Sequence, residues 1–166
     1  MSNLRRYFRG GDVVFLTHVT YERRPILADE AALFLECMSR QCGEVGVEVI
    51  AWVVLPDHVH LLVEAQEAHV PNLMRRIKLA FSSAYRERHG LVKGRLWQLR
   101  YWDHIIRDQE DMNRHTDYIH YNPVKHGYAR DPSEWEWSSF GSFVATGKYE
   151  PHWGKIAQER GKEYGE

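Results

Sequence analysis

The sequence has very little cysteine, because only Cys37 and Cys42 occur among its 166 residues. Both fall in one predicted helix, and neither has metal-ligand partners nearby. Two cysteines within one helix exclude a disulfide framework and favour a reducing compartment. No run of about 18 apolar residues occurs, so the sequence predicts no membrane-spanning helix. The first six residues also lack the apolar stretch of a signal peptide. We therefore expect a cytoplasmic protein.

Motifs of several enzyme classes are missing as well. There is no glycine-rich phosphate loop, since Gly10-Gly11 is too short and precedes a predicted strand. The Gly-x-Ser-x-Gly pattern of serine hydrolases and a convincing pair of catalytic carboxylates are also absent. These absences disfavour nucleotide hydrolases of the P-loop type, serine hydrolases and glycosidases.

The sequence has almost no net charge, with 22 Lys+Arg against 23 Asp+Glu. By itself, a net charge of −1 is atypical of a nucleic-acid-binding protein. The charge is unevenly distributed, however, because residues 75–100 contain eight basic residues and one acidic residue. Such a basic segment can bind polyanions, or it can form a solvated helix face.

The length and the hydrophobic content of 43% suit one globular domain with a sizeable core. We expect a single domain over residues 1–166, with a core of about 5–143 and a tail of 144–166. Strands are predicted at 12–20, 47–55, 59–64 and 96–106 from β-branched and aromatic content. Helices are predicted from their period at 29–42, 73–85 and 108–122.

Three residues set the predicted helix ends. Gly43 and Gly90 would end the first two helices, and Pro123 would end the third near Asn122. The resulting order, β-α-β-β-α-β-α, predicts an α+β fold of the ferredoxin-like, split βαβ type. It comprises a four-stranded antiparallel sheet with helices on one face, and an extra C-terminal helix that carries Tyr118.

Two histidines occupy alternate positions of the third predicted strand. His58 and His60 therefore share one face, about 7 Å apart at the backbone, while Val59 and Leu61 face the core. Two adjacent imidazoles on a rigid strand form half of a divalent-metal site. The alternative is a pair of polar strand residues that face solvent.

The last predicted helix carries a second group of chemically active side chains. Tyr118 and Asn122 lie four residues apart and share a face with Asp111 and His115. An activated tyrosine can attack as a nucleophile, and an asparagine oxygen can bind a hard cation. A helical tyrosine is more often an ordinary residue at the edge of a core.

The segment of residues 97–104 interleaves aromatic residues with Arg100 and polar groups. Aromatic rings stack on unpaired bases and arginines hold phosphates, so the segment could bind single-stranded nucleic acid. A packed sheet strand explains Trp97 and Trp102 equally well.

Together these motifs resemble the single-tyrosine HUH transposases, in particular the REP-associated tyrosine transposases. The matching segments follow the family's order: Arg5-Arg6-Tyr7 before Gly10-Gly11, residues 51–60 (AWVVLPDHVH), Trp97-Gln98, residues 100–104 (RYWDH) and residues 117–127 (DYIHYNPVKHG). They span about residues 5–143.

The resemblance implies a role for each matched position. His58 and His60 would bind a divalent metal, Mg²⁺ or Mn²⁺, and Tyr118 would be the nucleophile. Asn122 occupies the place of a third, helix-borne ligand, which is often Gln in related transposases. Tyr121 lies about 60° away from Tyr118 around the helix and is a lesser candidate nucleophile.

The resemblance also implies the reaction and the partner. The protein would cleave and join single-stranded DNA at hairpin-containing repetitive (REP-like) sequences through a 5′-phosphotyrosine intermediate. It would act on bacterial, nucleoid-associated DNA without contacting a membrane. A monomer is expected, with a dimer as the alternative. The residues expected to contact DNA are Arg5, Arg6, Arg75, Lys78, Arg86, Arg95, Arg100 and Arg107.

Two other classes of function remain open from the sequence. A non-catalytic, ferredoxin-like nucleic-acid-binding protein would also explain the basic segment and the aromatic strand. A small-molecule metallohydrolase is disfavoured because nothing completes a zinc site. The general base of the expected reaction is not identified by the sequence.

Overall fold

The computed structural model describes residues 12–65, 70–150 and 153–154. The predicted DNA contacts Arg5 and Arg6 lie outside these residues. The elements are β1 (Asp12–Val19), a 3₁₀ turn η1 (Tyr21–Arg23), α1 (Ala31–Val45), β2 (Glu48–Val54), β3 (His58–Ala65), α2 (Val70–His89), β4 (Trp102–Ile105), α3 (Gln109–Lys125), η2 (Pro132–Glu134) and α4 (Phe140–Ala145).

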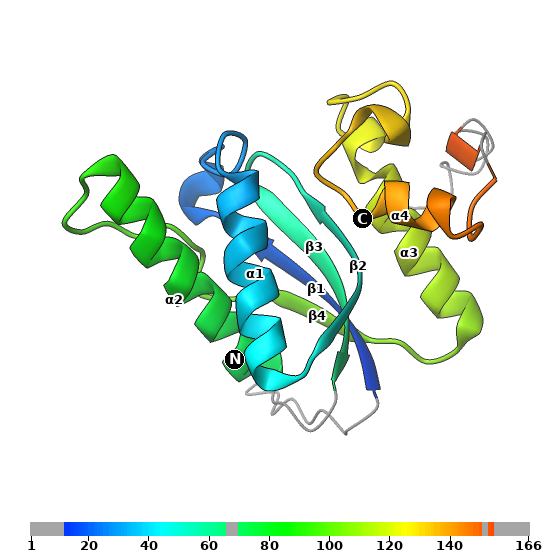
Figure 1. Cartoon of the computed structure of the whole chain (residues 1–166), viewed down its shortest axis with the longest axis horizontal. Coiled ribbons are helices and arrows are strands. Elements are labelled where there is room, and N and C mark those ends of the chain that lie inside the picture. The colour runs from blue at the N-terminus through cyan, green and yellow to red at the C-terminus, as the bar shows by residue number, and fades with distance from the viewer. Residues whose placement is uncertain (1–11, 66–69, 151–152, 155–166) are drawn as a thin grey trace.

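The four strands form one antiparallel sheet in the order β2-β3-β1-β4. β1 lies inside the sheet and pairs with β3 from Asp12↔Ala65 to Val19↔His58. The helices α1 and α2 connect β1 to β2 and β3 to β4, as in two interlocked βαβ units (Figure 1). This confirms the predicted ferredoxin-like, four-stranded antiparallel fold.

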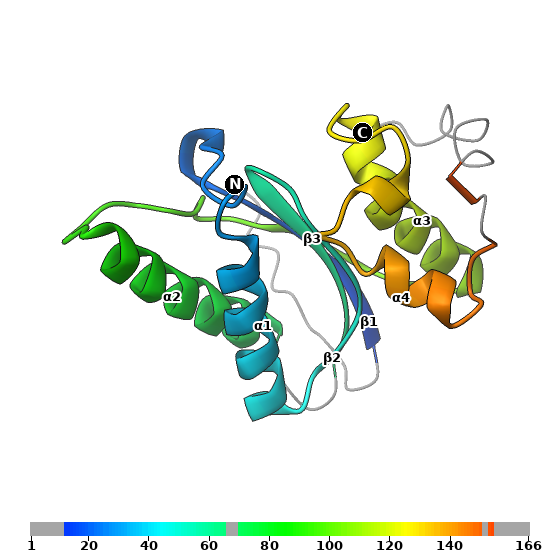
Figure 2. The same ribbon diagram turned by 45° about the horizontal axis from the view of Figure 1, so that its top comes forward.

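The sheet separates two layers of helices. α1 and α2 cover one face, whereas α3 and α4 lie on the other (Figure 2). Side-chain alternation assigns β3 to both layers, because Val59, Leu61 and Val63 belong to the core under α1 and α2. Leu62 belongs to a smaller core that includes Ile119 of α3. The seventh element, α3, is therefore the extra helix expected beyond the ferredoxin-like core.

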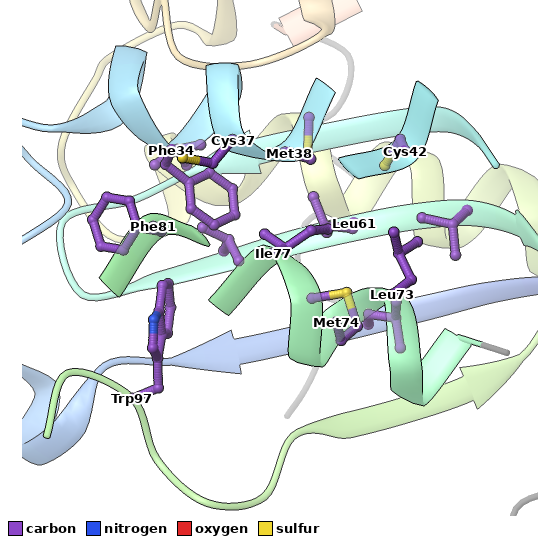
Figure 3. Close-up of a cluster of buried hydrophobic side chains, with 14 of the residues drawn as sticks. Phe34, Cys37, Met38, Cys42, Leu61, Leu73, Met74, Ile77, Phe81 and Trp97 are labelled. Atoms are coloured by element: carbon purple, nitrogen blue, oxygen red, sulfur yellow. The ribbon is translucent and has the colours of Figure 1, made fainter. Parts of the chain in front are cut away.

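The larger core is built from bulky apolar side chains between α1, α2 and the sheet. Phe34 of α1 meets Phe81 of α2 with ring centroids 5.8 Å apart, and Trp97 packs against both rings (Figure 3). Burying one such side chain stabilises the fold by about 1.5–3 kcal/mol. The same core contains Cys37 and Cys42 as free thiols, as expected, and burial raises the pKa of Cys42 to about 11.

Two helix ends differ from the prediction. α1 continues through Gly43 to Val45 and ends at Gly46, whose φ of 67° provides the left-handed cap. Gly43 tolerates the helix because neighbouring turns pack on α2, and packing outweighs its propensity cost of about 1 kcal/mol. α3 continues through Pro123 to Lys125 instead of ending near Asn122. The residue before a proline usually avoids helical backbone geometry, and this preference is overridden at Asn122.

The fourth strand is shorter than predicted. Only Trp102–Ile105 pairs with β1, whereas the prediction covered residues 96–106. Trp97 forms an isolated bridge with Thr20 and is buried in the larger core. The aromatic and β-branched composition of the segment before β4 therefore reflects the burial of an irregular segment and does not indicate a longer strand. None of the helices in the described ranges is long and apolar enough to span a membrane.

Candidate active site

His58 and His60 lie side by side on β3, with ring centroids 4.9 Å apart. Both are buried, and both face the layer of α3. The predicted shared face of the two histidines is therefore confirmed. Because neighbouring residues point the other way into the larger core, the strand holds both rings in a fixed position.

One nitrogen of each ring is held by a neighbouring oxygen. His58 Nδ1 donates to Asp57 Oδ1 at 2.6 Å, and His60 Nδ1 is hydrogen-bonded to Thr17 Oγ1 at 2.8 Å. His60 Nε2 is buried and has no hydrogen-bond partner among the described residues. Metal-ligating histidines characteristically have one nitrogen held in this way and the other free for the metal.

The electrostatic environment keeps His60 neutral. Burial lowers its pKa well below the usual value, and the nearby His58, His126 and Lys125 lower it further. Neutral imidazole is the form that binds metals, so the ring is in the required protonation state. The donor set fits a divalent ion better than it fits a solvent-facing pair of polar residues.

Tyr118 of α3 lies directly against this pair. Its ring centroid is 5.2 Å from that of His60 and 5.9 Å from that of Phe15. The Lys125 ammonium lies 5.0 Å from the Tyr118 ring centroid, and Tyr118 is half-buried. A positive charge near a phenol favours its ionised form, which is the nucleophilic one.

Asn122 is completely buried one helical turn beyond Tyr118. Neither its Oδ1 nor its Nδ2 has a hydrogen-bond partner within the part of the chain that the structure describes. His126, a further four residues on, has its ring 5.2 Å from that of His58. Because Tyr118 meets His60 and His126 meets His58, Asn122 sits between two positions of α3 that contact the histidine pair.

An unpaired, buried amide costs about 1–3 kcal/mol, so its retention indicates a ligand that the protein alone does not supply. The residues present thus fit a divalent ion, with imidazole nitrogens from β3 and an amide oxygen from α3. The sequence assigned no role to His126. Its spacing of four from Asn122 and eight from Tyr118 is the signal that places it on the same helix face.

The other candidate tyrosine is placed differently. Tyr121 is half-buried and makes no ring contact with either His58 or His60 in the described structure. Only Tyr118 of the two tyrosines therefore meets the histidine pair.

A buried histidine anchors α3 to the sheet. His120 is fully buried and bridges Ser139 Oγ at 2.7 Å and Tyr149 Oη at 3.0 Å. Ser139 Oγ in turn accepts from the backbone N–H of Trp52 on β2. Burial lowers the pKa of His120 to about 3. This network fixes the position of α3, and therefore of Tyr118, relative to the strands.

A second cluster lies at the start of α3 and was not singled out as a site by the sequence. His104, Asp111 and His115 present ligand-type atoms within 4.8 Å of one another. Burial alone would raise the pKa of Asp111, but hydrogen bonds from His104, Arg107 and Arg114 hold it well below its usual range. The backbone N–H of Asp111 donates to Asp108 Oδ1 at 2.8 Å, so Asp108 caps the start of α3.

Three of the predicted DNA contacts lie on the opposite side of the sheet from Tyr118. Arg75, Lys78 and Arg86 are on α2, in the layer on the opposite side of the sheet. Lys78 Nζ donates to Gln98 O at 3.3 Å, and Arg86 Nη2 donates to Gly94 O at 2.6 Å.

The remaining predicted contacts come from the segment after α2. The Arg95 guanidinium lies over the Tyr21 ring at 5.0 Å, and Arg100 is exposed. Arg107, beside Asp111, is the member of the set that the structure brings to the α3 layer.

Known transposases are similar to this chain over most of its length. Residues 13–122 match the family described as Transposase IS200 like. The REP-associated tyrosine transposase of Escherichia coli (strain K12) is 33% identical over 156 residues, which cover 92% of this chain and 91% of that protein. A Haemophilus influenzae protein assigned to the same group is 35% identical over 165 residues, which cover 93% and 94% of the two chains.

A solved structure supports the same relationship. The REP-associated tyrosine transposase bound to a REP hairpin matches with a TM-score of 0.79 at 34% identity, over 90% of this chain and 89% of that one. The family match includes the strand with His58 and His60 and the part of α3 up to Asn122, which contains Tyr118. The chain therefore belongs to the IS200-like transposases, as a member of their REP-associated tyrosine transposase group, and is an enzyme.

Proposed function

We propose that this transposase cleaves single-stranded DNA next to a hairpin, with Tyr118 as the nucleophile. The observation that carries the proposal is the contact between Tyr118 and His60, at 5.2 Å between ring centroids. The Tyr118 oxygen loses its proton and attacks the scissile phosphorus, and the bond from phosphorus to the 3′ oxygen breaks. The 3′ oxygen takes up a proton, and the 5′ phosphate remains joined to Tyr118.

His58, His60 and Asn122 would hold the divalent ion, Mg²⁺ or Mn²⁺. When bound, the ion would polarise the scissile phosphate and neutralise its developing charge. Asp57 and Thr17 orient the imidazoles by bonding their Nδ1 atoms. The orienting bonds leave the Nε2 atoms as ligands, and the Asn122 amide oxygen is the third donor from the protein.

Lys125 supports the nucleophile electrostatically. Its ammonium lies on the Tyr118 ring and stabilises negative charge on the phenolate as the proton leaves. After cleavage the same charge lies near the phosphotyrosine link. Because the link conserves the energy of the phosphodiester bond, a 3′ hydroxyl can attack it to rejoin strands without ATP.

The proposed substrate is a hairpin with an adjoining single strand, in bacterial nucleoid DNA. The relative whose structure contains a REP hairpin supports this choice. Arg107 would contact the strand beside Tyr118. Arg5, Arg6, Arg75, Lys78, Arg86, Arg95 and Arg100 would add phosphate contacts that weaken as the salt concentration rises. We propose that the protein acts as a monomer.

A denaturing gel tests the proposal directly. The protein is incubated with labelled, hairpin-bearing single-stranded DNA and Mg²⁺ or Mn²⁺, and a covalent protein–DNA adduct is expected. Tyr118→Phe should give no adduct, whereas Tyr121→Phe, the matched control on the same helix, should retain it. An adduct with Tyr118→Phe would disprove the nucleophile assignment. Absence of an adduct with the unmodified protein would favour a non-catalytic DNA-binding protein.

A further inference from the structure

A buried carboxylate organises four basic side chains at the start of α3. The Asp111 side chain is 1% exposed, and its Oδ2 accepts from His104 Nε2 at 2.7 Å and from Arg107 Nε at 3.2 Å. Its Oδ1 accepts from Arg114 Nη2 at 3.1 Å. His115 Nδ1 donates to the backbone oxygen of Asp111 at 2.9 Å. One acidic group thus fixes two guanidiniums and two imidazoles.

The guanidiniums have donors left for a ligand. The Arg107 and Arg114 side chains are 69% and 47% exposed, although the carboxylate that they share is buried. Each guanidinium has five N–H donors and remains charged at any physiological pH. Two permanent positive charges against one negative charge leave the cluster with a positive excess, which favours an anion such as a phosphate.

Three rings are stacked beside these guanidiniums. Trp102 stacks on His104 with an interplanar angle of 6° and centroids 6.0 Å apart. His104 stacks in turn on His115, at 13° and 4.6 Å. Trp102 ends the row on the edge strand β4 and is 54% exposed. The indole is linked to the guanidiniums through His104 and Asp111, and an exposed ring near cations can bind an unpaired nucleotide, because the ring stacks on the base and the cations hold the phosphate.

This row of rings is continuous with the candidate active site. The Phe15 ring contacts Trp102 at 5.5 Å, His115 at 4.8 Å and Tyr118 at 5.9 Å between centroids. We propose that Trp102, Arg107 and Arg114 form a subsite for one unpaired nucleotide that adjoins the scissile phosphate. Trp102 stacks on the base, and the two guanidiniums bind the phosphate. The inference rests on the proposed function, because it assumes that Tyr118 marks the cleavage position.

His104 and Asp111 act as positioning residues in this subsite. His104 supports the Trp102 ring from beneath, and Asp111 fixes both guanidiniums. The same cluster contains three metal-type ligands, but both carboxylate oxygens are bonded to arginines. His115 Nδ1 must also carry a proton, because it donates to a carbonyl oxygen. Both features favour a phosphate over a cation.

Fluorescence anisotropy with two labelled DNAs tests the subsite. One DNA is a bare hairpin and the other carries a single-stranded extension, both measured in the Tyr118→Phe background to prevent cleavage. Trp102→Ala should weaken binding of the extended DNA by about 5- to 100-fold, as loss of one stacked base predicts, and Arg114→Gln should also weaken it, because a phosphate contact is lost. The bare hairpin should bind within about 2-fold of the parent protein. Trp102→Phe should restore most of the affinity.

Controls separate the subsite from general effects. Arg40→Gln removes an exposed arginine from α1 in the other helix layer and should leave both affinities unchanged. In the extended DNA, 2-aminopurine at the stacked position should be quenched by the parent protein and not by Trp102→Ala. Equal binding of the extended DNA by parent and both variants would overturn the subsite. An equal loss for both DNAs would overturn it as well.

The test distinguishes the subsite from the proposed function. An adduct formed by the unmodified protein, without the extension-specific losses, would disprove the subsite alone. Failure to form any adduct would disprove the proposed function, whereas the anisotropy result would still measure the subsite. Mn²⁺ binding that survives His58→Ala with His60→Ala, and is lost with His115→Gln, would identify a cation site and overturn the proposal.

Discussion

The two faces of the sheet are built for different purposes, although the same strands supply both. Under α1 and α2 the core is large, mostly apolar and filled by rings such as Phe34 and Phe81. Under α3 the apolar cluster is smaller, and polar groups such as His60 and Asn122 are buried beside it. The face under α1 and α2 supplies most of the stability. The face under α3 contains buried polar groups that a protein selected for stability alone would not need, as is typical of functional sites.

The polar groups of the α3 face differ in how completely they are bonded. His120 is satisfied by Ser139 and Tyr149, so it ties the helix to the sheet. Asn122 lacks any partner within the described residues. Completely bonded groups are therefore structural, and incompletely bonded ones mark the ligand position. The larger core contains comparable exceptions among the described residues, since both ring nitrogens of His18 and Nε1 of Trp97 are buried without a hydrogen-bond partner.

The largest effect on stability should come from the apolar face. Phe81→Ala removes a fully buried ring from between α1 and the sheet and should lower the free energy of unfolding by about 3–5 kcal/mol. Urea denaturation followed by circular dichroism measures this change. A loss below about 1 kcal/mol would show that the face under α1 and α2 is not the main source of stability.

Metal binding should also depend on the residue that orients His60. Thr17→Val keeps the shape of the side chain but removes the hydroxyl bonded to His60 Nδ1. Mn²⁺ affinity, measured by calorimetry, should fall by about 10- to 100-fold, as is usual for residues that orient metal ligands. Unchanged Mn²⁺ affinity would show that this bond does not serve a metal site.

Asn122 provides the sharpest contrast between stability and function. Asn122→Leu replaces two unpaired polar atoms by methyl groups in a similar shape, so stability should be unchanged or rise by about 1–3 kcal/mol. Adduct formation should be lost. Ile119→Ala, a fully buried apolar position of the same helix, should instead lower stability by about 2–5 kcal/mol. A clear loss of stability in Asn122→Leu would mean that the amide is bonded within the folded protein.

Acid should destabilise the apolar face through His18. Burial, followed by the charge of Lys78, lowers its folded-state pKa to about 3, against about 6.5 when unfolded. Only the unfolded chain binds this proton between pH 6.5 and 3, so stability falls as the pH decreases through that window. The contribution is about 1.4 kcal/mol per pH unit, and it is absent above pH 6.5.

His18→Phe should remove this contribution. Urea denaturation between pH 7 and 4.5 should then show a shallower decrease in stability with acid than the unmodified protein. An identical pH slope in the variant would contradict the assignment to His18. His120, with a pKa also lowered to about 3, should account for part of the slope that remains.

The smallest effect should come from the arginines of the α2 layer. Arg75 is exposed, and its Nη2 donates to Asn72 Oδ1 at 3.2 Å. Arg75→Gln should weaken DNA binding a few-fold and reduce the slope of log affinity against log salt by about 1. Arg40→Gln on α1 is the matched control. An unchanged slope would restrict the DNA-binding surface to the α3 layer.

Local sequence patterns predicted the parts of the fold that depend on near neighbours. Alternation on the third strand separated His58 and His60 from Leu61, and the structure confirms that separation. The helical period and Gly90 defined α2 well, since this helix presents a continuous apolar stripe to the core.

Patterns failed where packing overrides a local preference. Gly43 and Pro123 were predicted to end helices, yet both lie inside helices that pack along the sheet or another helix. Trp97 was assigned to a strand, although its ring serves the larger core from an irregular segment. Propensity acts over a few residues, and a buried interface of several turns outweighs it.

By itself, the sequence determined which side chains share a face, because strand and helix periods are local properties of the backbone. It thereby supplied the histidine pair and the helix bearing Tyr118, and its motifs resembled the correct family. Only the tertiary structure brought Tyr118 against His60, set His126 against His58 and placed His104 of β4 against Asp111 of α3. These contacts join residues from separate elements, and their geometry follows from how α3 packs on the sheet rather than from any spacing along the chain.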